Sequence, residues 1–303
     1  MIRYFSRQML HVRKGENGQA LVLFLVVVCS VMTLLFVSVV AHNVAASRVA
    51  CANAIDAIAL NAATWEARCL NIIAALNDGI SKCMDIIFWT CAVWAVLAAL
   101  AAFGIGVPAF NAYTEYAREL VSKCWKTAHM LASWSEQIRD LAPYLVLGET
   151  IALASKLGVE GILHPFDPRG PHDGPNTLEL HLEYGPPIHL IDAFEPVFTL
   201  LSRLNKARRP DGTLKAIRNV LNSTINFILG GNNKPIRKLV PEKDFPKRQF
   251  VRFVGSRKIQ PLPIPFWGNH GTERIFEQAQ AEPYGGGAES MTWKSRLTKW
   301  EDK

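Results

Sequence analysis

The chain has 303 residues, a net charge of +7 and hydrophobic side chains at half of its positions. Such an apolar composition excludes a disordered chain, and the length accommodates a membrane portion together with one soluble domain. Charge is spread unevenly, because the segment 200–260 holds fifteen Lys or Arg against three acids, a net charge of +12. The rest of the chain is therefore net acidic.

The first predicted element is an apolar helix at residues 20–41, which contains no charge and no proline. As a helix it extends about 33 Å, enough to cross a hydrocarbon core of about 30 Å. It exceeds the apolar region of a cleaved secretory signal, about 7–15 residues, and therefore predicts a retained membrane anchor. Four basic residues precede it: Arg3, Arg7, Arg13 and Lys14. A positive flank stays inside, so we expect residues 1–18 in the cytoplasm and residue 42 on the other side.

An Ala-rich stretch follows, and twelve of the 33 residues from 43 to 75 are alanine. Without glycine or proline before Gly79, it predicts that the anchor continues as one helix, so that the unit 19–80 ends in a turn at Asn77, Asp78 and Gly79. Small side chains let helices pack closely. Asn53 and Asp56 share a face, which indicates either a solvated stripe or hydrogen bonding to a partner helix.

A second apolar run, at residues 86–110, is also free of charge. Trp89 and Trp94 lie near one end, and Tyr113 and Tyr116 follow the other, as in helices that end at membrane interfaces. The run predicts either a second membrane span or a buried helix of the soluble domain. With two spans the segment 111–303 is cytoplasmic, and with one span it lies outside.

The N-terminal third resembles the TadE/TadG-like proteins of tight-adherence (Flp) pilus assembly. The residues that carry this resemblance are GQALVLFLVVV at 18–28, NAIDAIALNAA at 53–63 and TWEARCLNIIAALNDGI at 64–80, with AQAEPY at 279–284 and WKSRL at 293–297 near the C-terminus. The family and helix-packing positions are Gly18, Gln19, Ala20, Asn53, Asp56, Ala57, Ala63, Trp65, Arg68 and Asn71. The resemblance implies a protein of the bacterial inner membrane, without catalysis or cofactor, whose partners are other pilin-like or pilus-assembly subunits and the lipid bilayer.

One position departs from the pilins that prepilin peptidase cleaves, which usually carry Glu five residues after the cleaved bond. Ala20 stands at that distance from Gly15, and Leu23 stands there from Gly18. We therefore expect the N-terminus to persist.

The soluble portion, residues 111–303, predicts a mixed α+β domain. Helical spacing of apolar residues covers 111–158, with a break or kink at Pro143. The further predicted elements are a strand at 178–184, helices at 188–206 and 213–229, a strand at 247–254, an extended segment at 259–268 and a helix or strand at 274–282. Together the predictions describe a membrane-anchored α+β protein with a long pilin-like N-terminal helix and a second apolar helix.

No motif for phosphate binding or nucleophilic catalysis is found, and Gly285–Gly287 predicts only a loop. His164, His172, His181 and His189 are spaced unlike any familiar metal site, so neither a metal nor a cofactor is expected. Cys51 and Cys69 lie about 27 Å apart on a straight helix and cannot bridge each other. Pairing of Cys83 or Cys124 with either of them stays open.

The basic segment 200–260 leaves an alternative function. Its charges suit a solvated surface, contact with anionic lipid or contact with nucleic acid, of which the last is the least favoured. The leading hypothesis is a non-enzymatic component of a pilus-like or secretion system. The alternative is a basic membrane protein that binds anionic lipid or nucleic acid and has no pilus role.

Overall fold

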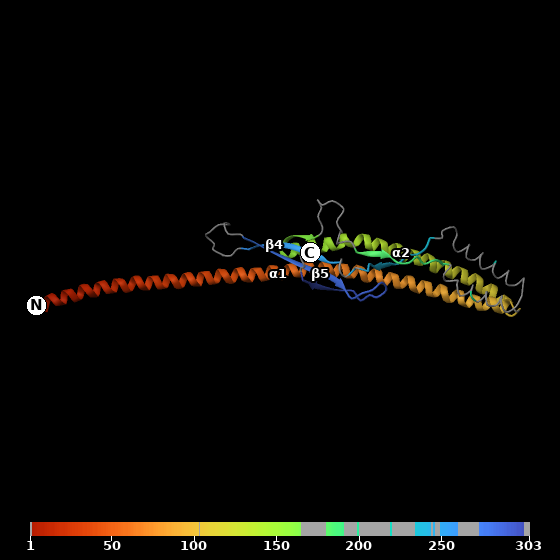
Figure 1. Cartoon of the computed structure of the whole chain (residues 1–303), viewed down its shortest axis with the longest axis horizontal. Helices are drawn as coiled ribbons and strands as arrows, with labels where there is room; N and C mark the ends of the chain where they lie inside the picture. The colour runs from red at the N-terminus through yellow and green to blue at the C-terminus, as the bar shows by residue number, and fades with distance from the viewer. Residues whose placement is uncertain are drawn as a thin grey trace.

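The computed structural model describes residues 2–102, 104–164, 180–190, 199, 219, 234–243, 245, 249–259 and 273–299, with side chains in the first helix from Leu21 to Ala101. The elements in chain order are α1 (Ile2–Ala102), α2 (Val107–Leu157), β1 (Glu160–His164), β2 (Leu182–Tyr184), β3 (Leu239–Pro241), β4 (Val251–Ile259), β5 (Glu273–Tyr284) and β6 (Lys294–Thr298). Figure 1 shows α1 as the long axis of the molecule, with α2 and the strands laid along its second half. The layout is α+β, as predicted.

The helix α1 is continuous for 101 residues. The prediction of a turn at Asn77–Gly79 is therefore wrong. The Asn77 side chain does not cap the helix but donates two hydrogen bonds to carbonyl groups of the C-terminal half of the chain. Gly79 serves close packing, because a Cβ there would lie 3.0 Å from the Leu131 side chain of α2.

The apolar run 86–110 is not one helix, which corrects the second prediction. The helix α1 ends at Ala102, and α2 begins at Val107 after a turn in which Gly104 and Gly106 have φ angles of 78° and 74°. Gly104 donates its N–H to the carbonyl of Ala101, and Ile105 donates to that of Leu100, the pattern of a glycine-terminated helix. The run therefore forms both arms of a helical hairpin.

The helix predicted over 111–158 is confirmed as α2, which begins four residues earlier and ends at Gly158 in the left-handed region. Pro143 lies inside α2 without ending it. Chain direction reverses at the hairpin turn, so α2 runs back antiparallel along α1 (Figure 1).

The main sheet has the order β1-β4-β5-β6, with every neighbouring pair antiparallel. The segment 274–282, left open between helix and strand, belongs to β5. The strand predicted at 247–254 is present but displaced, since β4 covers Val251–Ile259. Its alternation is confirmed, because Val251 and Phe253 are buried while Arg252 is half-buried.

A second sheet pairs β2 with β3, and a bridge between Ile188 and Ile236 extends the pairing. The strand predicted at 178–184 is thus limited to Leu182–Tyr184 among the described residues. The helix predicted from residue 188 does not begin there, because Ile188 pairs with Ile236 instead. The segment 259–268 beyond Ile259 and nearly all of 191–206 and 213–229 lie outside the described residues.

Three apolar clusters succeed one another along α1. The first joins α1 residues Cys51–Ala63 to α2 and the inner face of the main sheet. The second packs Ala67, Leu70 and Ile73 against Leu239, Phe245 and Trp293. The third, from Ile80 to Ala98, holds the two hairpin arms together. Alanines dominate the first cluster, and the absence of longer side chains lets α2 and the sheet approach the helix on both sides.

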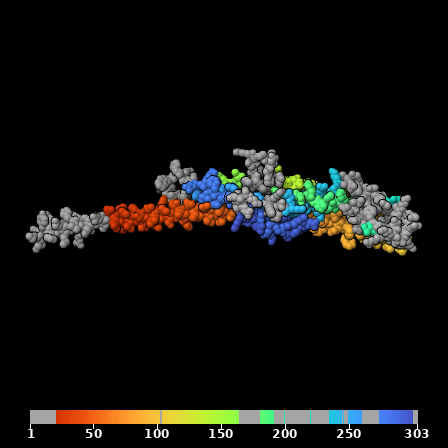
Figure 2. All heavy atoms as spheres, viewed as in Figure 1, coloured from red at the N-terminus to blue at the C-terminus, as the bar shows by residue number. Residues whose placement is uncertain are grey.

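The apolar part of α1 before the first cluster stands clear of the rest of the molecule (Figures 1 and 2). Every side chain from Leu21 to Val39 is exposed. Within the described part of the chain, α1 is the one helix long and apolar enough to cross a membrane, and its most apolar window is not buried by the protein.

The six cysteines are free thiols. Cys83 of α1 and Cys124 of α2 border the hairpin cluster. Burial raises the pKa of both thiols, and proximity to Cys83 raises the pKa of Cys124 further. The two thiols are therefore neighbours across the helix pair.

This proximity predicts that a short bismaleimide joins Cys83 to Cys124 within one chain, at a pH high enough to form thiolates. Mass spectrometry of the digested protein would detect the linked peptides. Cys124→Ser should abolish the product, and Cys29→Ser should leave it unchanged. Absence of the link in the folded wild-type protein would contradict the antiparallel hairpin.

Candidate functional site

Polar residues of α1 bind the C-terminal part of the chain where the second and third apolar clusters meet. We call this arrangement the clasp. Its members are Asn71, Asn77 and Ser81 of α1, Lys238 and Leu239 at β3, and Ala288, Glu289 and Trp293 of the loop between β5 and β6. The clasp joins segments more than 150 residues apart in sequence.

Asn71 binds the backbone of Trp293 in both directions. Its amide nitrogen donates to the Trp293 carbonyl at 3.1 Å, and its amide oxygen accepts the Trp293 N–H at 3.0 Å. The Trp293 indole donates to the Gly287 carbonyl at 3.3 Å and packs 4.9 Å from the Phe245 ring, centroid to centroid. A Cβ at Gly286 would lie 2.2 Å from the indole, so this position requires glycine.

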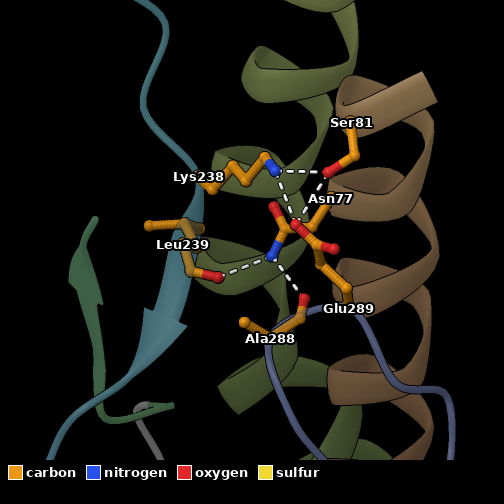
Figure 3. A network of polar contacts seen from close by, with 6 residues as sticks. All are labelled: Asn77, Ser81, Lys238, Leu239, Ala288 and Glu289. Atoms are coloured by element: carbon orange, nitrogen blue, oxygen red, sulfur yellow. Dashed lines mark hydrogen bonds and ion pairs between the residues drawn. The ribbon is translucent and has the colours of Figure 1, made fainter. Parts of the chain in front are cut away.

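Asn77 is fully buried and lies at the centre of the clasp (Figure 3). Its amide nitrogen donates to the Leu239 carbonyl at 2.7 Å and to the Ala288 carbonyl at 2.8 Å. One side chain of α1 thereby satisfies backbone carbonyls from two separate C-terminal segments. Buried carbonyls need such partners, because an unpaired one costs about 1–3 kcal/mol.

An ion pair closes the clasp toward solvent. Lys238 contacts Glu289 at 2.5 Å and also donates to the Ser81 hydroxyl, which in turn donates to Glu289 at 2.7 Å (Figure 3). Hydrogen bonds from Lys238 and Ser81 lower the pKa of Glu289. Glu289 is half exposed, so this pair fixes geometry more than it adds free energy.

A second buried polar group, Glu66, lies on α1 five residues before Asn71. It is fully buried, and burial raises its pKa to about 8, an effect that the nearby Gln249 side chain partly offsets. Gln249 is also fully buried, and its side-chain oxygen accepts the His181 N–H at 3.0 Å. At neutral pH Glu66 is therefore mainly protonated, which avoids an ionised carboxylate in the core.

The structure spreads the predicted positions along α1 instead of gathering them. Asn53, Ala57 and Arg68 are exposed, Asp56 and Trp65 are half-buried, and Ala63 is fully buried. Arg68 lies over the Trp65 ring at 4.6 Å. Asn71 alone among them joins the clasp. The side chains of Gly18, Gln19 and Ala20 lie outside the described residues.

The face shared by Asn53 and Asp56 carries no hydrogen bond to another helix of this chain among the described contacts. Asp56 has a raised pKa because it is partly buried and lies near Glu277. Glu277 in turn pairs with Arg48 at 2.9 Å. Thus the sheet approaches one edge of this face, while Asn53 and Ala57 remain open to solvent.

The arrangement offers hydrogen bonding and packing rather than reactive groups. Among the described residues, no three His, Cys, Asp or Glu side chains gather as a metal site requires. His181 hydrogen-bonds with Gln249 through its backbone. The His164 side chain and His172 lie outside the described residues.

Comparison with known proteins adds no relative. No family model matches the chain, and neither the curated proteins nor the solved structures contain a significant match.

Sequence reasoning missed Glu66, Asn77 and Trp293 as structural centres. A signal for the first two exists in the helical period, because both interrupt the apolar stripe that includes Ile58, Ile73 and Ile80. A polar residue on such a stripe indicates a buried partner. Trp293 carries no comparable signal, since its contacts come from distant segments.

We predict that Asn77→Ala lowers the free energy of unfolding by about 2–3 kcal/mol, because two buried carbonyls lose their donor. Thermal unfolding of the detergent-solubilised chain, followed by near-ultraviolet circular dichroism, would measure the loss. The matched control is Asn53→Ala on the exposed face of the same helix, with a change within about 0.5 kcal/mol. Equal effects of the two substitutions would contradict the clasp.

Glu66 predicts a pH dependence of stability. Its folded pKa of about 8 exceeds the ordinary value of 4.5, so the native state retains a proton that the unfolded chain releases between these values. The contribution is full below pH 4.5 and declines as pH rises toward 8, by up to about 1.4 kcal/mol per pH unit. Glu66→Gln should flatten this decline in unfolding experiments, whereas Glu119→Gln on the exposed surface should not. A wild-type curve without the decline would refute the assignment.

Proposed function

We propose that this protein is a non-enzymatic structural or assembly component of a tight-adherence (Flp) pilus-like or secretion system in the bacterial cell envelope, of the TadE/TadG-like kind. The observation that carries the proposal is the continuity of α1, which extends from an exposed apolar stretch into the core of the α+β domain without a break. Such a helix connects a bilayer to a folded domain without a flexible linker. The resemblance of segments 18–28 and 53–80 to that family supports the same assignment.

The apolar stretch 21–41 is the membrane anchor in this proposal. Its large apolar side chains are exposed, and so many exposed Leu, Val and Phe residues are unfavourable in water. A bilayer removes this surface from water and also suits the length of the stretch. With the basic N-terminus in the cytoplasm, the anchor lies in the inner membrane.

The soluble part lies outside the cytoplasm in this proposal. The support is the hairpin, because α2 turns back along α1 and both arms pack on the same clusters. A chain that crossed the membrane at 86–110 would place α2 on the opposite side from residues 51–63, which it contacts. One span therefore accounts for the packing, and residues 42–303 share one compartment.

Only part of the Ala-rich stretch remains exposed and can contact a partner subunit. The α+β domain covers Ala54, Ala59, Ala62 and Ala63. Asn53 and Ala57 remain exposed on the open side of α1. We therefore propose that neighbouring pilin-like subunits pack along the anchor and this open face.

The alternative of a basic lipid- or nucleic-acid-binding protein gains no specific support from the described part of the segment 200–260. Lys238 pairs with Glu289, and Lys258 pairs with Glu160 at 3.4 Å. Arg252 donates to Gln280 at 2.8 Å. These basic side chains have partners within the chain itself.

We predict that Ala57→Leu reduces assembly at least tenfold while leaving insertion and folding unchanged, because Ala57 is exposed in the single chain and a larger side chain would hold a neighbouring helix away. Assembly would be measured as the amount of surface filament or of crosslinked envelope complex. The matched control is Ala152→Leu, an exposed alanine on α2. Normal assembly of Ala57→Leu would count against the proposed face.

Ala63→Leu tests a different property, because Ala63 is fully buried in the chain's own core. Overpacking at such a position costs about 1–3 kcal/mol. A loss of assembly in this variant should therefore accompany a lower melting temperature, which Ala57→Leu should not show.

A further inference from the structure

The end of the helical hairpin is uncharged, and many of its large apolar side chains are exposed. We call residues 86–114 the hairpin tip; they form the last part of α1, the turn and the first part of α2, and contain no Asp, Glu, Lys, Arg or His. Charged residues begin directly at both ends, with Asp85 on α1 and Glu115 on α2. Figure 1 places the turn at the opposite end of the molecule from the N-terminus.

Large side chains on the outside of the hairpin tip face away from the protein. Trp89 is 67% exposed and Ile105 is 62% exposed. The other exposed large apolar side chains of the tip are Ile86, Phe88, Val93, Val96, Leu100 and Val107. They lie along the outer side of α1 and at the turn, where α2 begins with Val107.

The inside of the hairpin tip is a well-packed helix pair. Trp94 packs against Phe110 at 5.4 Å between ring centroids, and its indole donates to Thr114 at 3.0 Å. Two threonine side chains form hydrogen bonds within the hairpin: Thr90 donates to the Ile86 carbonyl, and Thr114 donates to the Phe110 carbonyl. The inner side of the tip is therefore packed, while large apolar side chains on its outer side are exposed.

The backbone of the turn also suits apolar surroundings. Gly104 and Ile105 donate to the last carbonyls of α1, and Phe110 donates to the carbonyl of Gly106. Pro108, near the start of α2, has no N–H to satisfy. These bonds and Pro108 reduce the number of unpaired backbone groups at the turn, although no described side chain caps the start of α2.

We infer that the hairpin tip inserts into a lipid bilayer other than the one that holds the anchor. The aromatic residues Trp89 and Tyr116 are exposed beside the charge boundary, where such side chains prefer the headgroup region. From Trp89 to Ala102 the helix extends about 20 Å, close to half of the about 40–45 Å that a bilayer spans with its headgroups. The tip enters one leaflet, and the hairpin turns back without crossing.

The length of α1 excludes the anchor's own bilayer. From residue 42 to Ala102 the continuous helix extends about 90 Å. No proline or break within it allows the tip to fold back to the first membrane. The protein is therefore a bridge between two lipid surfaces, an activity beyond the proposed pilus-like role that depends only on the anchor.

The test uses the full chain reconstituted through its anchor into phosphatidylcholine vesicles, with protein-free fluorescent phosphatidylcholine vesicles as acceptors. Clustering is measured by dynamic light scattering and by co-flotation of the acceptors. The wild-type protein should cluster the two populations, with little change when salt is raised, because the hairpin tip carries no charge. Absence of protein from its own vesicles would refute the anchor, whereas incorporation without clustering would refute the bridge.

The double variant Trp89→Glu with Ile105→Glu should reduce clustering at least tenfold, because each carboxylate opposes entry into lipid. The matched control is Ile162→Glu with Phe276→Glu, exposed at 65% and 66% on the sheet, which should remain within twofold of wild type. The crosslink between Cys83 and Cys124 verifies that each variant keeps the hairpin.

Three results would overturn the inference. Unchanged clustering by the tip variant would assign the contact to another surface. Clustering only when both vesicle populations carry the protein would replace lipid by a second copy of the chain. A steep decline with salt would assign the contact to basic residues.

Discussion

The continuity of α1 is the constraint on which the rest of this structure depends. A helix hydrogen-bonds its own backbone from end to end, so one element can pass from an apolar environment into water without an unsatisfied group at the boundary. Side chains alone must then change along its length. They do so in steps, from exposed Leu, Val and Phe, through the Ala-rich contact with the sheet, to the larger residues of the hairpin. The strands β1, β3, β4, β5 and β6 each pack on this helix or on α2, and β2 pairs with β3.

A single helix has no interior, so its apolar side chains can be buried only by other elements. In this protein α2 and the strands bury one part of α1 in three successive clusters. Alanine at the first cluster brings the layers close, and the ring pair of Phe245 and Trp293 fills the second. The opposite side of the helix, with Asn53 and Ala57, stays exposed.

Apolar contacts alone would let these segments slide along the helix, since they have little directional preference. The clasp removes this freedom. Asn71 and Asn77 pair with specific backbone groups of Leu239, Ala288 and Trp293. Because a misplaced segment would bury unpaired carbonyls, the polar contacts define the register. Glu66 differs from these asparagines, because its carboxyl group is ionisable. Burial raises its pKa, so the group is accommodated in the core mainly in the protonated form.

Local period and composition predicted the anchor-like apolar helix, its Ala-rich continuation, the helix after residue 111 and the alternation of β4. The same reasoning misplaced the end of α1, since Asn77–Asp78–Gly79 has the local chemistry of a turn, and it joined 86–110 into one helix although Gly104 and Gly106 lie within it. The continuity of α1 through Asn77–Gly79 depends on contacts that form only in the folded chain. Asn77 finds its partners at Leu239 and Ala288, and Gly79 accommodates Leu131, and none of these contacts is visible within one helical turn of sequence. Long-range partners, rather than local propensity, thus explain why the helix continues through Asn77–Gly79 and which side of it stays exposed.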